Sequence, residues 1–169
     1  GDSTYILAYI PRKLVRDVEE SGQFMTLFLS EIDVDNQWVR WVRAGHDPAI
    51  VYDPVQDRFE ELKGSGLALG LDEKFIYEEN VKTELASGQI IAIGTDGIWE
   101  TFNQDGEMFG KRRFREIIRK NAQMDAIDIL DALYREIDTF SRGLKKKDDI
   151  TLVIVKIVET SPESGDWQI

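Results

Sequence analysis

Apolar and polar residues follow different patterns in the two halves of the chain. Short apolar runs bounded by Gly, Pro, Asn or Asp predict strands at 24–32, 38–42, 49–52, 58–62, 76–85, 90–94 and 150–158. Apolar residues at helical spacing predict helices within 3–21 and at 97–102, 111–120 and 125–142. Strands therefore dominate the first half and helices follow, which predicts an α+β domain whose sheet packs on a second sheet or on helices.

The clearest of these predicted helices is the one at 125–142. Asp125 can cap its start, and Gly143 can end it. Its apolar residues form one stripe that we expect to face the core: Ile127, Leu130, Tyr134, Ile137 and Phe140.

Composition narrows the class of protein. The 169 residues are enough for one domain with a core, which we expect at 1–158 with a polar tail at 159–169. A net charge of −11 argues against nucleic acid or an anionic membrane as the partner. No apolar run approaches the ~20 residues that span a bilayer. The absence of cysteine excludes disulfides, thiolate catalysis and Cys-type zinc sites, and we expect a cytoplasmic protein.

Two acidic motifs mark the ends of the two most apolar predicted strands. Asp96-Gly97 follows the run at 90–93, and Asp148-Asp149 precedes the run at 150–155. Either motif alone is typical of an ordinary cap or strand start. Together they predict rigidly held carboxylates side by side, because adjacent core strands would bring these ends together. Such a pair suits a hard divalent cation, which relieves the repulsion between the two charges.

His46 and a glycine-rich loop are the other candidates for chemistry. His46 is the only histidine, so a multi-histidine zinc site is excluded, and the chain has no Gly-x-Ser-x-Gly motif for a serine nucleophile. The loop at 64–70 misses the dinucleotide fingerprint and lacks the P-loop ending, which disfavours a nucleotide-binding enzyme. We interpret it as a backbone turn, with a flank of a substrate groove as the alternative.

Basic residues gather in two places. The first is a predicted helix face formed by Lys111, Arg112, Arg113, Arg115, Arg119 and Lys120. It is either a solvated surface or a docking face for an acidic protein, with Arg112 and Arg115 as candidate contacts. The second is the run 145–147, which is either a solvated loop or, through Lys147, an attraction for an anionic substrate.

Several motifs in order resemble the PPM metal-dependent Ser/Thr protein phosphatases. The residues concerned are Asp96-Gly97 after an apolar strand, Glu100, Asn103, Gly106, Glu107, Phe109-Gly110 and Asp148-Asp149-Ile150-Thr151. The chain is more closely similar to the bacterial SpoIIE/RsbU-like branch, through Phe24-Met25-Thr26-Leu27, the Ala-Gly-His-x-Pro stretch at 44–48, and Leu69-Gly70-Leu71. Order and spacing agree from about residue 12 to residue 158.

The resemblance implies an α-β-β-α sandwich with two Mn²⁺ or Mg²⁺ ions between the sheets. Asp96 and Asp148 match catalytic metal ligands, and Gly97 and Asp149 match positions in the same metal site. His46 matches a signature of the branch that we assign to substrate or partner contact. The implied reaction is hydrolysis of phosphoserine or phosphothreonine on a protein, with metal-activated water as the nucleophile. The implied partner is a phosphorylated anti-sigma-factor antagonist in bacterial stress or sporulation signalling, with an upstream sensor or receiver domain.

One departure from the family pattern leaves a second function open. The family carries another metal-binding Asp-Gly motif on an early strand, and no segment of this chain matches it. We therefore expect the N-terminal portion of the full domain to lie ahead of residue 1. A non-catalytic interaction module with an incomplete metal site is the alternative function. A sheet face left uncovered would favour self-association, for example as a homodimer.

Overall fold

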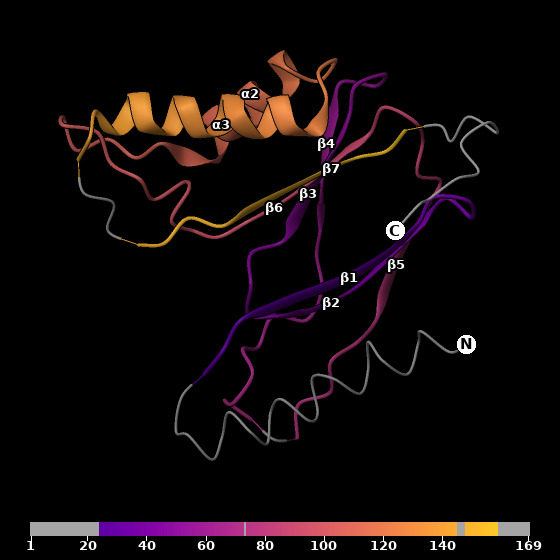
Figure 1. Cartoon of the computed structure of the whole chain (residues 1–169). Helices are drawn as coiled ribbons and strands as arrows, with labels where there is room; N and C mark the ends of the chain where they lie inside the picture. Colours follow the sequence, from indigo (N-terminus) through magenta and orange to yellow (C-terminus); the bar gives the residue numbers. More distant parts are fainter. Residues whose placement is uncertain (1–23, 73, 145–147, 159–169) are drawn as a thin grey trace, which may run out of the picture.

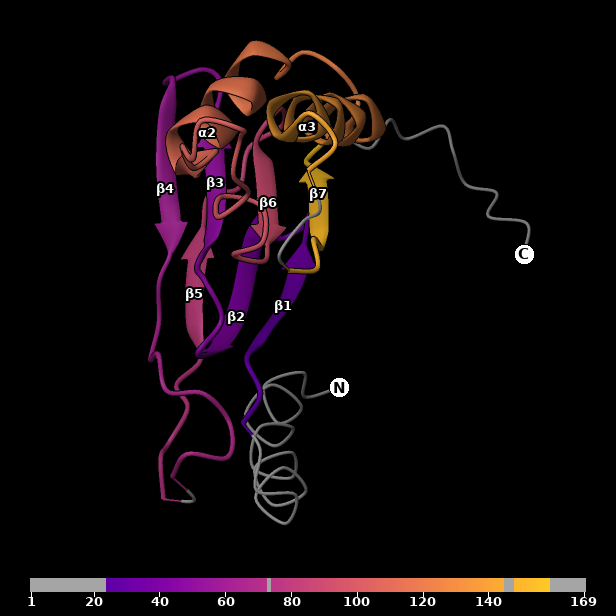
Figure 2. The ribbon, with the colours of Figure 1, turned by 90° about the vertical axis from the view of Figure 1, so that its left-hand side faces the viewer.

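The computed structural model describes residues 24–72, 74–144 and 148–158. The predicted helix within 3–21, the candidate Lys147 and the predicted tail at 159–169 lie outside these residues. The described part consists of two antiparallel sheets that face each other, with two helices on the outer side of one sheet (Figures 1 and 2). This arrangement confirms the predicted α+β class. None of its helices is long and apolar enough to cross a membrane.

The first sheet has three strands and the second has four. The first has the order β1-β2-β5, formed by Leu27–Asp33, Trp38–Ala44 and Asn80–Thr83. The second has the order β4-β3-β6-β7, formed by Arg58–Leu62, Ala49–Asp53, Ile90–Gly94 and Leu152–Lys156. The strand predicted at 76–85 is thus shorter than expected, and so is the strand predicted at 150–158.

The continuous apolar run of β6 reflects burial on both of its faces. Ile90 and Ala92 pack toward the helices, whereas Ile91 and Ile93 pack toward the first sheet. A strand covered on both sides gains from apolar residues at every position, so it lacks the alternation of a half-exposed strand. β6 is therefore held by packing from two layers as far as Ile93, three residues before Asp96.

The helical layer consists of α2, Gly110–Lys120, and α3, Ala126–Ser141. In Figure 1 both helices lie across the outer face of the second sheet. The expected inward stripe of α3 is only partly right. Ile129, Leu133 and Ile137 are fully buried at i, i+4 spacing, whereas Ile127 is 62% exposed. Ile127 lies two residues, or about 200°, from Ile129 around the helix, so both cannot face the sheet.

Two further predictions, the cap of α3 and the helix at 97–102, also need correction. Asp125 occupies the N-cap of α3, but its side chain makes no capping hydrogen bond. The helix predicted at 97–102 is a turn, in which the Thr101 hydroxyl donates to the Gly97 carbonyl at 2.7 Å. The chain then folds back, because the amide of Phe109 donates to the Thr101 carbonyl at 2.8 Å. A helix cannot continue where its next residues pair with a returning segment.

The corrected face of α3 gives a stability prediction. We expect Leu133→Ala to lower the free energy of unfolding by about 2–5 kcal/mol, because it leaves a cavity under the helix. Ile127→Ala on the same helix is the matched control and should change it by no more than about 0.5 kcal/mol. Urea denaturation followed by circular dichroism measures both. A larger loss for the Ile127 variant would contradict this orientation of α3.

Candidate active site

The pairing of β6 with β7 brings the two acidic motifs together. Gly94 at the end of β6 lies opposite Leu152 at the start of β7 in an antiparallel register. Because one strand ends where the other begins, the residues after Gly94 and before Leu152 emerge at the same edge of the sheet. The two segments that carry Asp96 and Asp148-Asp149 are therefore neighbours, as the sequence predicts.

Thr95 joins these two segments beyond the last paired residues of the strands. Its amide donates to the Thr151 carbonyl at 3.1 Å. Its hydroxyl accepts from the Thr151 amide at 3.0 Å and donates to the Asp149 carbonyl at 3.2 Å. Thr95 was not among the site residues predicted from the sequence. The available signal was a hydroxyl residue directly between an apolar strand and an aspartate.

Gly97 is required because the two segments approach closely. A Cβ atom at this position would lie 2.5 Å from the carbonyl oxygen of Asp149. That distance is shorter than van der Waals contact allows, and the obstructing atom belongs to the backbone. The glycine of the first motif is thus explained by its contact with the second motif.

A cleft of about 210 Å³ opens beside Asp96. It is lined by Thr26, Gly45, His46, Asp47, Thr95, Asp96, Trp99 and Glu100. The lining comes from the segments next to β1 and β2 of the first sheet and from the turn after β6 of the second sheet. The structure therefore places His46 and Asp96, which the sequence suggested separately, in one cleft. Asp148 and Asp149 are neighbours of this region but are not part of the lining.

The carboxylates provide the donor type that Mg²⁺ and Mn²⁺ prefer, but the described residues do not complete a site. Among residues 24–72, 74–144 and 148–158, no group of three or more Asp, Glu or His side chains is close enough to hold an ion. Asp148 also accepts a hydrogen bond from the amide of Asp149 at 2.8 Å. The assignment of Asp96, Gly97, Asp148 and Asp149 to a metal site stays a prediction.

Lys111, in the first turn of α2, lies at the rim of the cleft. Its ammonium is 3.3 Å from the Asp47 carboxylate and 4.7 Å from the centroid of the Trp99 ring. Asp47 belongs to the segment after β2, and Trp99 to the turn after β6. Lys111 therefore connects the two walls of the cleft, through an ion pair on one side and a cation–π contact on the other.

Most of the basic segment on α2 is engaged within the chain. Arg115 pairs with Glu61 at 2.6 Å, and Arg119 pairs with Asp57 at 2.6 Å. Both guanidinium groups also lie over the Phe59 ring, at 5.8 and 5.1 Å from its centroid. These contacts attach α2 to the β3–β4 hairpin and favour a structural role for Arg115. Arg112 is different, because its side chain is 79% exposed and its ion pair within the described part of the chain is with Glu116 of the same helix.

The Asp57 contacts shift three ionisation equilibria. The hydrogen bonds from Arg119 and, at 2.9 Å, from the Tyr52 hydroxyl hold the pKa of the Asp57 carboxyl below its ordinary value. The same carboxylate raises the pKa of Arg119. Burial, followed by the contact with Asp57, raises the pKa of Tyr52. All three shifts favour the charged pair and the neutral phenol that hold α2 on the hairpin.

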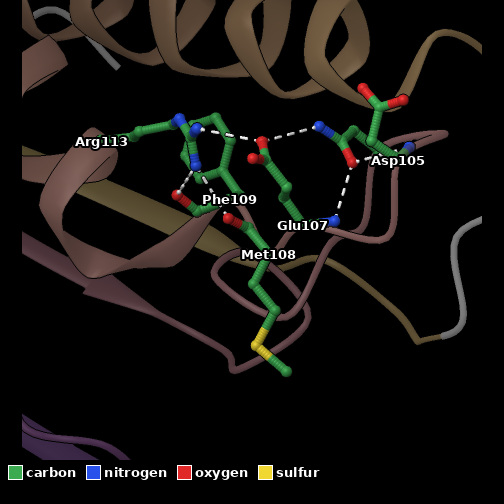
Figure 3. A network of polar contacts seen from close by, with 6 residues as sticks. Asp105, Glu107, Met108, Phe109 and Arg113 are labelled. Atoms are coloured by element: carbon green, nitrogen blue, oxygen red, sulfur yellow. Dashed lines mark hydrogen bonds and ion pairs between the residues drawn. The ribbon is translucent and has the colours of Figure 1, made fainter.

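A polar network shapes the loop between the cleft and α2 (Figure 3). The side-chain oxygen Oδ1 of Asn103 accepts from the backbone amides of Asp105 and Glu107 at 3.0 and 2.8 Å. Arg113 donates to the carbonyls of Met108 and Phe109 at 2.8 and 3.1 Å and lies 3.6 Å from the Glu107 carboxylate. Arg113 thus holds this loop in place. The contacts between Asn103 and Glu107, which follow Asp96 in the sequence, are contacts within the loop.

Comparison with known proteins identifies the class and then the family. The SiaA-PP2C domain of Pseudomonas aeruginosa aligns with a TM-score of 0.70 at 19% identity, over 92% of this chain and 71% of that one. The Mn-presoaked phosphatase domain of SpoIIE from Bacillus subtilis aligns with a TM-score of 0.64 at 21% identity, over 92% and 76%. The fold is therefore that of PP2C-type phosphatase domains. The family model for stage II sporulation protein E matches residues 2–158, and the chain belongs to the SpoIIE family.

Curated relatives agree with this family and are longer than the chain. Phosphoserine phosphatase RsbU of Bacillus subtilis (strain 168) is 25% identical over 144 residues, which cover 85% of this chain and 42% of RsbU. Protein IcfG of Synechocystis sp. is 26% identical over 136 residues, which cover 80% of this chain and 21% of IcfG. The chain thus spans less than half the length of these relatives.

The contact between the two acidic motifs gives a second prediction. We expect Gly97→Ala to lower the free energy of unfolding by about 1–3 kcal/mol, because the new methyl group must displace the Asp149 backbone. Gly64→Ala is the control, since the atom closest to its Cβ would be Asn80 Nδ2, the end of a side chain that can move, and the next, Arg43 Cβ at 3.5 Å, is at ordinary contact distance. Chemical denaturation compares the two. Equal effects would show that the close approach at Gly97 is unimportant.

Proposed function

We propose that this chain forms the catalytic part of a metal-dependent protein phosphatase that hydrolyses phosphoserine or phosphothreonine. One observation carries the proposal: β6 and β7 deliver Asp96 and the Asp148-Asp149 pair to the same edge, beside a cleft that also holds His46. Membership of the SpoIIE family and the likeness to a relative named phosphoserine phosphatase support this chemistry.

The charge of the cleft explains why a cation is expected there. Asp47, Asp96 and Glu100 line it, and the described residues of the lining include no lysine or arginine. A phosphate monoester would be repelled by these carboxylates unless a positive charge intervened. Asp96 and Asp148 would hold Mn²⁺ or Mg²⁺, which supplies an activated water and neutralises the phosphoryl oxygens when bound. The chain itself keeps the Asp96 segment in place through Thr95 and orders the opposite wall through Asp47 and Lys111.

The substrate and the setting follow from the family resemblance. We propose a phosphorylated anti-sigma-factor antagonist as the substrate protein and a cytoplasmic location, with an upstream sensor or receiver domain in the whole protein. Of the two candidate contacts, Arg112 is better placed than Arg115 to meet an acidic partner, because it is exposed and its ion pair among the described residues is with its own helix, whereas Arg115 is paired with Glu61. Lys147, as a contact for an anionic substrate, remains part of this proposal.

The second candidate function is a non-catalytic interaction module. It is favoured by the absence of a three-residue ligand group among the described residues. Calorimetric titration with Mn²⁺ separates the two functions, because an interaction module needs no tight metal site. Because the chain is shorter than its curated relatives, the titration uses both this chain and the whole gene product that contains it.

Removing the Asp96 carboxylate tests the proposed function. We expect Asp96→Asn in the whole gene product to lower Mn²⁺-dependent hydrolysis of an aryl phosphate by about 100-fold or more. Its metal-free melting temperature should stay equal or rise slightly, because a repulsive charge is lost. Asp105→Asn, in the exposed loop of Figure 3, is the matched control and should leave activity unchanged. Full activity of the Asp96 variant would show that the ligands are misassigned.

Reversing the charge of Arg112 tests the proposed docking face. We expect Arg112→Glu to reduce turnover of a phosphoprotein substrate several-fold while turnover of an aryl phosphate is kept, because the rim charge affects partner encounter. Arg135→Glu on α3 makes the same change of net charge on another exposed arginine and serves as the control. Steady-state kinetics on both substrates measure the difference. Equal loss on both substrates would rule out a docking role.

A further inference from the structure

The turn that carries His46 is backed by the glycine-rich loop at 64–70. Gly45 has φ +68, and a Cβ atom there would lie 2.8 Å from the Cβ of Ala68. The amide of His46 donates to the Ala44 carbonyl at 2.8 Å, which closes a tight turn directly after β2. The loop therefore supports from behind the turn that lines the cleft, although no residue of the loop is part of the lining.

Arg43 ties the turn to the loop. It is the next-to-last residue of β2, and its Nε donates to the His46 carbonyl. Its Nη1 donates to the Gly64 carbonyl at 3.0 Å. A Cβ on Gly66 would come within 3.0 Å of the same Nη1, so the loop passes close to the guanidinium. One planar fork thus holds two carbonyls that are 18 residues apart in the chain, which a lysine ammonium cannot reproduce in the same geometry.

The hydrogen bond of the imidazole defines its tautomer. His46 Nδ1 lies 2.9 Å from the carbonyl oxygen of Asp47. A carbonyl oxygen only accepts, so Nδ1 must carry the proton in this contact. In the neutral ring Nε2 is then left as an acceptor. Arg43 binds the carbonyl of His46, and the carbonyl of Asp47 orients the ring. Because these residues are consecutive, the hydrogen bond of Arg43 restricts the backbone that orients the ring.

We propose that Arg43 is the positioning residue that fixes His46 in the wall of the cleft, with Nδ1 protonated and Nε2 available as an acceptor. Resting on the proposed phosphatase function, the group from which Nε2 accepts a hydrogen bond is the attacking water. Arg43 does not line the cleft, so it acts through His46 and not on the substrate.

The experiment uses the fact that His46 is the only histidine of the 169 residues. Its two ring nitrogens therefore give unique signals in ¹⁵N nuclear magnetic resonance of this chain. At a pH where the ring is neutral, the wild type should show Nδ1–H. Arg43→Gln should give a mixture of both tautomers, and its kcat in the whole gene product should fall about tenfold with KM within twofold. Arg43→Lys should restore less than half of either property.

Arg40→Gln is the matched control. Arg40 is on the same strand, but its guanidinium lies 4.3 Å from the centroid of the Trp38 ring and makes no contact with the turn. It should keep the wild-type tautomer and the wild-type kcat. Circular dichroism of every variant establishes that it is folded. If Arg43→Gln does not fold, the tautomer and the kcat of Arg43→Lys test the proposal. That variant keeps the positive charge and the aliphatic part of the side chain but loses the planar guanidinium.

Three results would overturn the proposal. The first is an Nε2–H tautomer in the wild type. The second is an unchanged tautomer in the folded Arg43→Gln or Arg43→Lys variant, and the third is a kcat within twofold of the wild type in the same variant. Absence of phosphatase activity in the wild type would instead refute the proposed function. The tautomer measurement would still decide whether Arg43 positions His46.

Discussion

The antiparallel register between β6 and β7 is the constraint on which the site depends. It sets Gly94 opposite Leu152, so the residues after Gly94 and the residues before Leu152 emerge at the same edge of the sheet. The strand is fixed before the motif begins, because β6 is buried by the helices on one face and by the first sheet on the other. Thr95 extends the attachment by one more residue, and Gly97 removes the side chain that would force the two segments apart. Backbone geometry, more than side-chain contact, therefore brings the acidic groups to one edge.

Different interactions hold the opposite wall of the cleft. Its residues follow β2, in a turn that relies on the left-handed backbone of Gly45 and on the support of Ala68. Polar contacts from outside the turn complete it: Arg43 from its own strand and Lys111 from α2. The site thus combines a wall fixed by strand pairing with a wall fixed by hydrogen bonds and charge. The wall that hydrogen bonds and charge hold in place is more easily disturbed by a single substitution, because each of its contacts involves a few exposed or half-exposed groups.

The sequence predicted the strands well where apolar runs were continuous or paired by short turns, as in β1 to β4 and β6. It also predicted that the segments of Asp96 and Asp148-Asp149 would be neighbours, since adjacent apolar strands bring these ends together; β7 nevertheless forms the edge of the described second sheet and is not a central strand. It placed α3 correctly along the chain but assigned Ile127 to the wrong face, because several apolar stripes fit an amphipathic helix until the sheet beneath selects one. The turn at 97–102 and the functions of Arg43 and Lys111 were not predictable. They depend on contacts between residues far apart in the chain, which local patterns do not encode.

Two partly exposed ion pairs connect different layers of the domain in addition to the apolar core. Lys111 meets Asp47 at the cleft, and Lys82 of β5 meets Glu60 of β4 at 3.0 Å. Ionic screening weakens such pairs while it leaves buried apolar contacts largely intact. The contact of Lys111 with Asp47, which joins the two walls of the cleft, therefore weakens as the ionic strength rises, whereas the buried apolar contacts between the layers are much less affected.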